Sequence, residues 1–509
     1  MGCGMSFRAS NAILSMSIIL AMCSASSGAL IEESDFTFIG AFRVPQGAYN
    51  GISYEYGGRG LAYNSANNSL FILSIYNSHV AEFSIPAPVN SSTLGDLNIA
   101  INLQSFEDIT EGNRNNIGEG GVECTGTQNF MGDFLIYNGS MYGSVYNYYD
   151  AALCAELSHF KSGTTLSTTG DFDGMYRVGD SAFNVGFRAG YMCEIPDAWQ
   201  SSFGGATAFT GLSFVAVMGR TSFGPSISTF YPDSLGVSEP SPSTMLVYYE
   251  DQGDDATFGT YYHPHDANPY ISTADWVGGV EFPEGSDTVL FIGMHGTGDW
   301  CYKCPEPNNP AGTGAWPYQY FVWAYDANDL AASHSGNYTV TQDDYNANRF
   351  WDGVYPNNTS LAVGDTVRPY NVVPYDTWAL TFPIEPDTTV TNWKEIRGTA
   401  YDPATNRLYL SAADIDGRRP VIQVYEINLS SPEDISITGA SVSGGSLALS
   451  WTDSGGSSEW QVQATINATT SYTILVDSAS ASFPVAAGTI DIKITGNASG
   501  TAQGGTSSS

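Results

Sequence analysis

Residues 56–73 read Tyr56-Gly-Gly-Arg-Gly-Leu-Ala-Tyr-Asn-Ser-Ala-Asn-Asn-Ser-Leu-Phe-Ile-Leu73, and a near copy, Ile396-Arg-Gly-Thr-Ala-Tyr-Asp-Pro-Ala-Thr-Asn-Arg-Leu-Tyr-Leu-Ser411, follows more than three hundred residues later. Each copy is a short apolar run, a turn rich in Asn, Asp or Pro, and a second apolar run. This pattern predicts a β-hairpin. A single hairpin cannot bury both of its faces, so the repeat indicates a stack or a closed ring of similar units.

Three further segments have the same layout, and they begin near residues 132, 206 and 278. The one at Asp133–Tyr146 contains the turn Asn138-Gly139, a strong hairpin signal. The hairpin near residue 206 is expected to pair Ala206–Phe209 with Leu212–Met218. The whole pattern resembles the secreted β-propellers, whose four-stranded blades close into a ring. We therefore expect an all-β fold with a five-bladed β-propeller. Six blades are the alternative, because the last interval is longer, and an array of β-sandwiches is the rival architecture.

The two ends of the propeller are expected to meet. The run Phe36–Arg43 alternates as a strand does and would supply the outer strand of the last blade. We place the propeller at residues 30–432. Residues 433–502 resemble a fibronectin type III domain, an immunoglobulin-like β-sandwich, because Trp451 falls on the second strand of the segment. Residues 503–509 are expected to be a linker or tail.

The N-terminus resembles a secretory signal, which we place at residues 1–29. Arg8 supplies the positive charge, Ile13–Ala21 the apolar core, and small residues lead to Ala29. No later apolar run is long enough to span a membrane. We expect a secreted protein, extracellular or periplasmic. Its formal net charge of −35 argues against nucleic acid or an anionic membrane as partner, because like charges repel.

Five cysteines remain after the predicted signal: Cys124, Cys154, Cys193, Cys301 and Cys304. In an oxidising compartment disulfides are the first expectation, and the odd number leaves one thiol over. The alternative for Cys301 and Cys304 is a zinc site completed by His295 and by His263 or His265. Calcium is the other candidate cofactor, held by the acidic loop 251–266, which is otherwise a solvated loop.

Propeller topology predicts which side chains share the mouth of the central funnel. Arg59 and Arg397 precede innermost strands, and the first and last blades are neighbours, so the two guanidiniums should lie side by side. Such a pair can bind a carboxylate or sulfate. The alternative is structural, with each arginine paired to a buried carboxylate between blades. Other side chains expected at the same mouth, near the ends of second strands, are His79, Tyr149, Arg220, His295 and Asp414.

Two kinds of catalysis fit the residue types. Histidine (His79 or His159), Tyr149 and Arg220 resemble the set that propeller polysaccharide lyases use for β-elimination from a uronate. A glycoside hydrolase would instead need two carboxyl groups, and Glu281 on an innermost strand is the candidate, with Asp133 and Glu123 near the second blade. The alternative for Glu281 is an ion pair with an arginine.

The sequence thus supports three functions. The first is a secreted propeller that binds an anionic polysaccharide at the funnel mouth, with cleavage by β-elimination as its enzymatic form. The second is a non-catalytic adhesion or scaffold protein, and the third is a glycoside hydrolase that uses Glu281. In each case the expected partner is an extracellular glycan or another cell-surface or matrix component.

Overall fold

The structure, a computed structural model, describes residues 28–75, 78–124, 129–148, 150, 153–180, 185–213, 222, 224–248, 275–298, 315–336, 372–386 and 393–429, with strand backbones within 5–8, 301–302, 313–314 and 435–497. The chain divides into two compact units. One contains residues 32–284 and 288–428, and the other contains residues 1–31, 285–287 and 429–509. Each unit is described by itself below.

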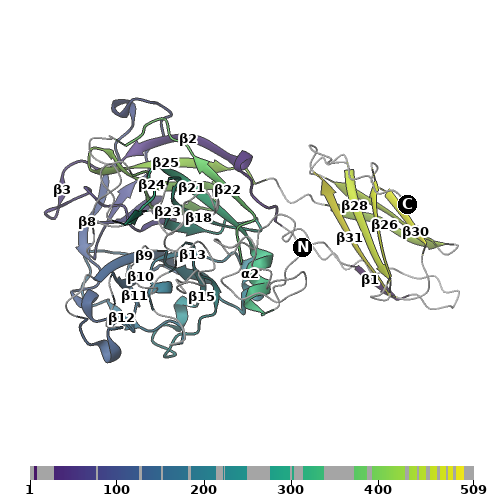
Figure 1. Cartoon of the computed structure of the whole chain (residues 1–509), viewed down its shortest axis with the longest axis horizontal. Helices are drawn as coiled ribbons and strands as arrows, with labels where there is room; N and C mark the ends of the chain where they lie inside the picture. The colour runs from purple at the N-terminus through teal and green to yellow at the C-terminus, as the bar shows by residue number, and fades with distance from the viewer. Residues whose placement is uncertain are drawn as a thin grey trace. The chain divides into compact units, whose positions relative to one another are not determined.

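The first unit is a β-propeller of five four-stranded antiparallel blades (Figure 1), as the repeat predicts. Blade 1 is β5 (Leu61–Asn64), β6 (Ser69–Leu73), β7 (His79–Ser84) and β8 (Asn102–Asp108). Blade 2 is β9 (Asn129–Tyr137), β10 (Ser140–Asn147), β11 (His159–Gly163) and β12 (Asp173–Tyr176). Blade 3 is β13 (Tyr191–Glu194), β14 (Ala208–Gly211), β15 (Ile227–Phe230) and β16 (Met245–Val247).

The last two blades include the parts of the chain that close the ring. Blade 4 is β17 (Trp276–Glu281), β18 (Thr288–Gly296), β21 (Tyr318–Asp326) and β22 (Asp376–Leu380). Blade 5 is β23 (Ile396–Asp402), β24 (Arg407–Asp416), β25 (Arg419–Ile427) and the N-terminal β2 (Phe36–Arg43). The innermost strands contact one another in ring order, β23 with β5 included. The ring is therefore closed, and β2 is the outer strand of the last blade, as expected (Figure 1).

Other elements are short. Two-stranded ladders are β3 (Ala48–Tyr49) with β4 (Ile52–Ser53), and β19 (Cys301–Tyr302) with β20 (Thr313–Gly314). The α-helices are α1 (Asp197–Gln200) and α2 (Ala327–His334). Short 3-10 turns are η1 (Glu33–Asp35), η2 (Leu94–Asp96), η3 (Asn113–Asn115), η4 (Glu119–Gly121), η5 (Val185–Phe187), η6 (Ser201–Phe203) and η7 (Pro232–Ser234). None of the helices within the described residues is long and apolar enough to cross a membrane.

Three of the five innermost hairpins turn on asparagine. Asn68, Asn138 and Asn406 have φ values of 49°, 49° and 53°, in the left-handed region that asparagine tolerates better than most residues. They occupy equivalent turns between the first and second strands of blades 1, 2 and 5. Asn138 is followed by Gly139 with φ 74°, the geometry that the Asn-Gly pair predicts.

The prediction for blade 3 assigned the wrong segments to its first and second strands. Ala208–Gly211 is the second strand of the blade rather than the first, and the innermost strand is Tyr191–Glu194. Only four residues form that strand, and α1 with η6 separates it from its partner, so no tight turn marks the hairpin. Residues 214–221, which include most of the expected second strand, lie outside the described residues.

The second unit contains two antiparallel sheets. One joins β26 (Ile435–Ser443), β27 (Ser446–Asp453) and β30 (Ser480–Pro484). The other has the order β1-β31-β28-β29, with β1 (Met5–Arg8), β31 (Thr489–Asn497), β28 (Glu459–Ile466) and β29 (Thr470–Val476). Trp451 lies on β27, the second strand of the segment. The fibronectin type III assignment stays a prediction.

Apolar side chains pack between adjacent blades. At the closure, Phe42 of β2 is fully buried in a cluster with Phe83, Tyr409 and Ile422. The rings of Phe42 and Phe83 lie 6.4 Å apart, edge to face. Strand β2 therefore binds by its side chains as well as by its backbone ladder.

Phe42→Ala should lower the free energy of unfolding by about 3–5 kcal/mol, because it removes a fully buried aromatic ring from the closing strand. Urea unfolding followed by tryptophan fluorescence measures the loss. Ile101→Ala is the control, since Ile101 is 69% exposed, and should change stability by no more than about 0.5 kcal/mol. Equal effects of the two variants would contradict the importance of the closing strand.

Candidate functional site

The five innermost strands surround a central channel whose two ends differ. The first halves of these strands line a small pocket of about 30 Å³ that includes Arg59, Trp276 and Arg397. Their second halves line a cavity of about 330 Å³. The larger cavity is close to the lower end of the range of known ligand sites, about 300–1,000 Å³. It is formed by the following residues: Leu61, Ala62, Tyr63, Ser65, Phe134, Leu135, Ile136, Met192, Cys193, Glu194, Ile195, Pro196, Asp197, Glu281, Phe282, Glu284, Thr399, Ala400, Tyr401 and Pro403.

At the small pocket the two arginines meet, as expected, but on a carboxylate. Arg59 Nη2 lies 3.0 Å from Glu395 Oε1, and Arg397 Nε lies 2.9 Å from Glu395 Oε2. Arg397 also pairs with Asp414 at 3.1 Å, and the Arg59 guanidinium lies 4.0 Å from the centre of the Trp276 ring. Burial opposes ionisation of Glu395, yet the guanidiniums of Arg397 and Arg59 keep its pKa below the usual value. These contacts match the structural alternative for the pair.

Glu395 was missed by the sequence reasoning. It lies two residues before Arg397, so strand alternation places both side chains on one side of the chain. That spacing is the signal that could have identified it.

The candidate histidines belong to three blades, with His79 in blade 1, His159 in blade 2 and His295 in blade 4. His159 is fully buried, with Nδ1 2.7 Å from Ser158 Oγ and Nε2 3.0 Å from Thr210 Oγ1. Burial, with a smaller effect of Arg188, lowers the pKa of His159 to about 3. The ring is therefore neutral and holds blades 2 and 3 together. His79 begins β7.

His295 is also buried, and its ring is oriented by an aspartate. Nδ1 of His295 lies 2.8 Å from Asp275 Oδ2, and Asp275 Oδ1 accepts a hydrogen bond from the amide of Gly296. The ring stacks on Phe321 at 4.4 Å.

Several predicted site residues lie outside the described residues. They are Tyr149, Arg220, His265, Cys304 and the side chain of Cys301. The acidic loop 251–266 lies outside them as well. Across the described ranges, no three His, Cys, Asp or Glu side chains are placed to hold a metal ion.

The described cysteines account for one disulfide and one thiol. Cys124 and Cys154 form a disulfide that joins two loops of the propeller. Cys193 is free, buried and part of the cavity wall. Burial, with the nearby carboxyl of Glu281, raises the pKa of this thiol well above its usual value, so it stays protonated.

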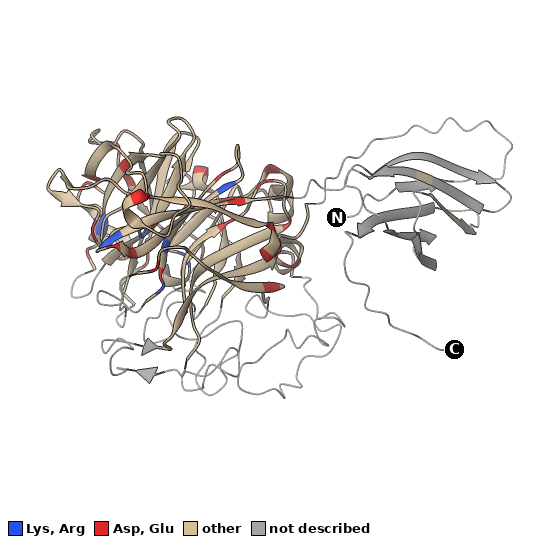
Figure 2. Cartoon of the chain, turned by 90° about the horizontal axis from the view of Figure 1, so that it is seen from above, with Lys and Arg blue, Asp and Glu red and all other residues tan. Residues whose placement is uncertain are grey.

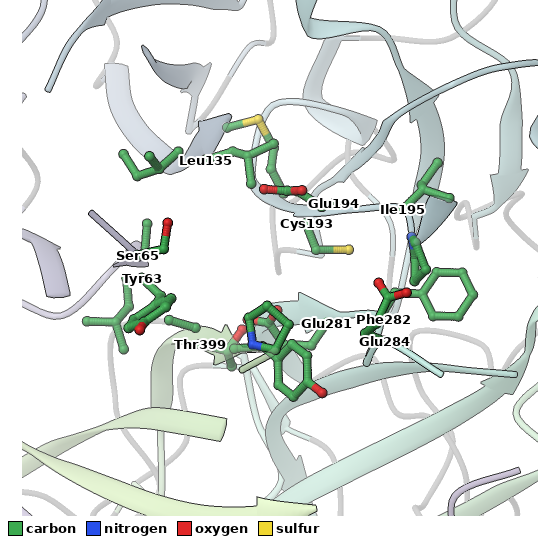
Figure 3. A pocket seen from close by; sticks show the side chains of 18 of the residues that line it. Tyr63, Ser65, Leu135, Cys193, Glu194, Ile195, Glu281, Phe282, Glu284 and Thr399 are labelled. Carbon is green, nitrogen blue, oxygen red and sulfur yellow. The ribbon is translucent and has the colours of Figure 1, made fainter. Parts of the chain in front are cut away.

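Glu281 is the deepest acid of the larger cavity. It ends β17 and is only 7% exposed, yet it lines the cavity wall (Figure 3). Burial raises its pKa to about 8, against a hydrogen bond from Thr399 and with a smaller contribution from the charge of Glu194. Gly279 permits this contact, because a Cβ there would lie 2.1 Å from Thr399 Oγ1. At neutral pH, Glu281 is therefore a protonated acid.

A second carboxyl, Glu194, faces the cavity from β13 (Figure 3). It retains access to water, but surrounding protein raises its pKa, and the charges of Asp197 and Glu284 add to this effect. Sequence reasoning missed Glu194 because its strand was not recognised. Of the carboxyls it did pair with Glu281, Glu123 is exposed on a loop and does not line the cavity.

Asp133 lies in the channel and lines the small pocket. It is 3% exposed, and its Oδ1 accepts a hydrogen bond from the amide of Phe134 at 2.8 Å. Burial, with the charge of Glu281, raises the pKa of Asp133 well above its usual value. The amides of Met192 and Leu61 also bond to it, so this carboxyl joins three innermost strands.

The sequence matches no protein-family profile and no curated protein. Among solved structures, the chain is similar to a glycosyl hydrolase from Bacteroides ovatus at 12% identity, covering 79% of this chain and 96% of that one, with a TM-score of 0.38. It is also similar to an exo-β-1,3-galactanase from Phanerochaete chrysosporium, at 10% identity, 90% and 96% coverage and a TM-score of 0.30. A luciferin-regenerating enzyme matches at 9% identity, 78% and 94% coverage and a TM-score of 0.29. Because these identities and TM-scores are so low, the comparisons carry no argument about function.

Glu395→Ala should lower the free energy of unfolding by about 3–5 kcal/mol, because two largely buried guanidiniums lose their shared carboxylate. Thermal and urea unfolding measure the change. The matched control is Glu385→Ala, which breaks a more exposed pair with Lys394 and should cost no more than about 1 kcal/mol. A neutral Glu395→Ala would show that the arginines are stable without it.

Glu281 should also make stability depend on pH. In the folded protein it keeps its proton up to about pH 8, whereas its ordinary pKa is 4.5. The folded state therefore binds more protons in this window, and the free energy of unfolding should fall as pH rises from about 4.5 to about 8. The difference between the wild-type and Glu281→Gln stability curves isolates this contribution. Parallel curves would mean that Glu281 ionises normally.

Proposed function

We propose that this protein is a secreted carbohydrate-processing propeller that cleaves glycosidic bonds in the larger cavity. The observation that carries the proposal is the presence of a protonated acid, Glu281, and a more accessible carboxyl, Glu194, in one cavity. Two carboxyl groups in one cavity, one deeply buried and one more accessible to water, are what glycoside hydrolysis needs. The predicted signal and the Cys124–Cys154 disulfide support export.

The chemistry assigned to each group follows from its environment. Glu281, held by Thr399, would donate its proton to the glycosidic oxygen as the leaving group departs. Glu194, in its ionised form, would stabilise the positive charge on the sugar, and it would either activate water or attack the anomeric carbon. Tyr63 and Tyr401 in the cavity wall offer rings that can contact a sugar. Their hydroxyl groups donate to Asn68 and Asn406, so toward a sugar they can act as acceptors.

The hypothesis of β-elimination from an anionic polysaccharide has less support. The arginines expected to bind its anionic substrate, Arg59 and Arg397, are already paired with Glu395 and Asp414. Its candidate catalytic arginine, Arg220, lies outside the described residues. His159 has both ring nitrogens occupied inside the protein. The lyase and the adhesion protein remain as distinct outcomes of the test.

Glu281→Gln should lower the rate of glycan cleavage by about 10²–10⁴-fold, because the amide cannot donate the proton. The measurement is release of reducing ends from a panel of neutral and charged polysaccharides. In the wild type the rate should also decline as pH rises through about 8, where Glu281 loses its proton. Glu119→Gln, at an exposed position that does not line the cavity, is the matched control and should keep full activity.

Three results would overturn this proposal. An unsaturated product that absorbs ultraviolet light would identify a lyase. Binding of a glycan without cleavage would identify an adhesion protein. Full activity of Glu281→Gln would place the chemistry elsewhere in the molecule.

A further inference from the structure

The wall of the larger cavity carries acids and no bases. Its carboxyl groups are Glu194, Asp197, Glu281 and Glu284, and no Lys, Arg or His is among the described residues that line it. The propeller as a whole is acidic, with few basic side chains among many acidic ones (Figure 2). A ligand in this cavity therefore meets a negative electrostatic potential with no compensating cation in the wall.

The acids of the rim repel one another. Burial raises the pKa of Glu194, and the charges of Asp197 and Glu284 raise it further. Burial likewise raises the pKa of Glu284, with a contribution from Asp197. A positive group placed among these carboxyls would relieve the repulsion and favour their ionised forms.

The positive group does not fit the description of a single metal ion. The described residues offer no three metal-binding side chains that converge on one point. In Figure 3, Glu194 lies on one side of the cavity, and Glu281 and Glu284 lie on the other. The arrangement suits a ligand that extends across the cavity and carries its charge on one substituent.

We infer that the cavity selects a cationic amino sugar, a hexosamine unit whose free amino group is protonated, within the glycan that the protein processes. This inference rests on the proposed function and names its substrate class. The ammonium group would lie beside Glu284, whose carboxylate would form a charge-assisted hydrogen bond to it, while Glu194 would attract it electrostatically from the other side of the cavity. The sugar hydroxyls would contact Tyr63 and Ser65, and the ring would pack against Tyr401.

The same reasoning disfavours two other ligand classes. A uronate would add negative charge beside four carboxyl groups, and none of the described wall residues supplies a guanidinium to offset it. A lysine-rich peptide is also positively charged. The lysine side chain, however, has no hydroxyl groups to bond with Ser65 and no sugar ring to pack against Tyr63 and Tyr401. The peptide is an outcome of the test below.

The test is isothermal titration calorimetry on full-length Glu281→Gln, which binds without rapid turnover. Glucosamine oligomers, N-acetylglucosamine oligomers of the same length, uronate oligomers and oligolysine are compared in weakly acidic buffer. The glucosamine oligomer should bind at least about tenfold more tightly than its acetylated counterpart, and added salt should reduce the ratio. Its binding should also release protons, seen as an enthalpy that depends on the buffer, because the ammonium lowers the pKa of Glu194 and Glu284.

Introducing Glu194→Gln and Glu284→Gln together into the Glu281→Gln protein should reduce its preference for the glucosamine oligomer over the N-acetylglucosamine oligomer to less than about threefold. The N-acetylglucosamine oligomers should still bind. Adding Glu119→Gln instead is the control and should leave the ratio unchanged.

Equal binding of the two oligomers would overturn the inference and leave the proposed function intact. Equally tight binding of oligolysine would assign the cavity to a basic peptide, and tighter binding of the uronate oligomer would reverse the predicted charge. Absence of binding by every saccharide would also overturn the inference, and if no polysaccharide of the panel released reducing ends either, the proposed function would fail with it.

Discussion

Antiparallel pairing between β2 and β25 is the constraint on which the rest of the propeller depends. It joins Phe36–Arg43 to the last blade, with Phe42 opposite Ile422, and so brings the two ends of the unit together. Only in the closed ring does β23 lie beside β5. The ion pairs of Glu395 with Arg59 and Arg397, and the wall of the channel between blades 1 and 5, follow from that contact.

Closure gives the channel two ends of opposite character. At one end, cationic side chains are neutralised by carboxylates, and the space that remains is about 30 Å³. At the other end, acids line a cavity about ten times larger, and the part of its wall that the structure describes supplies no cation. Asp133 lies in the channel, where it lines the small pocket and interacts electrostatically with Glu281. Ion pairs therefore connect neighbouring blades at one end of the channel. At the other end, the carboxyl groups of the larger cavity are available to a ligand.

The sequence was a good guide wherever structure depends on local turns and alternation. Asn138-Gly139 specifies its hairpin through backbone conformations that these two residues adopt easily. The proximity of Arg59 and Arg397 could be predicted from the order of the strands alone. The innermost strand of blade 3 escaped detection because Tyr191–Glu194 is short and α1 with η6 interrupts its hairpin. That error hid Glu194, so Glu281 was considered with Asp133 and Glu123 instead.

The sequence by itself determined the blade repeat, the closing strand and the placement of Glu281 on an innermost strand. Periodic burial along a strand and turn chemistry are local properties, so these features can be read from the order of residues. The tertiary structure decided which charges are neutralised. Arg59 and Glu395 are 336 positions apart, and Glu281 and Glu194 belong to different blades. Whether a buried charge finds a partner depends on neighbours that only the closed ring supplies, because electrostatic interactions act through space and not along the chain.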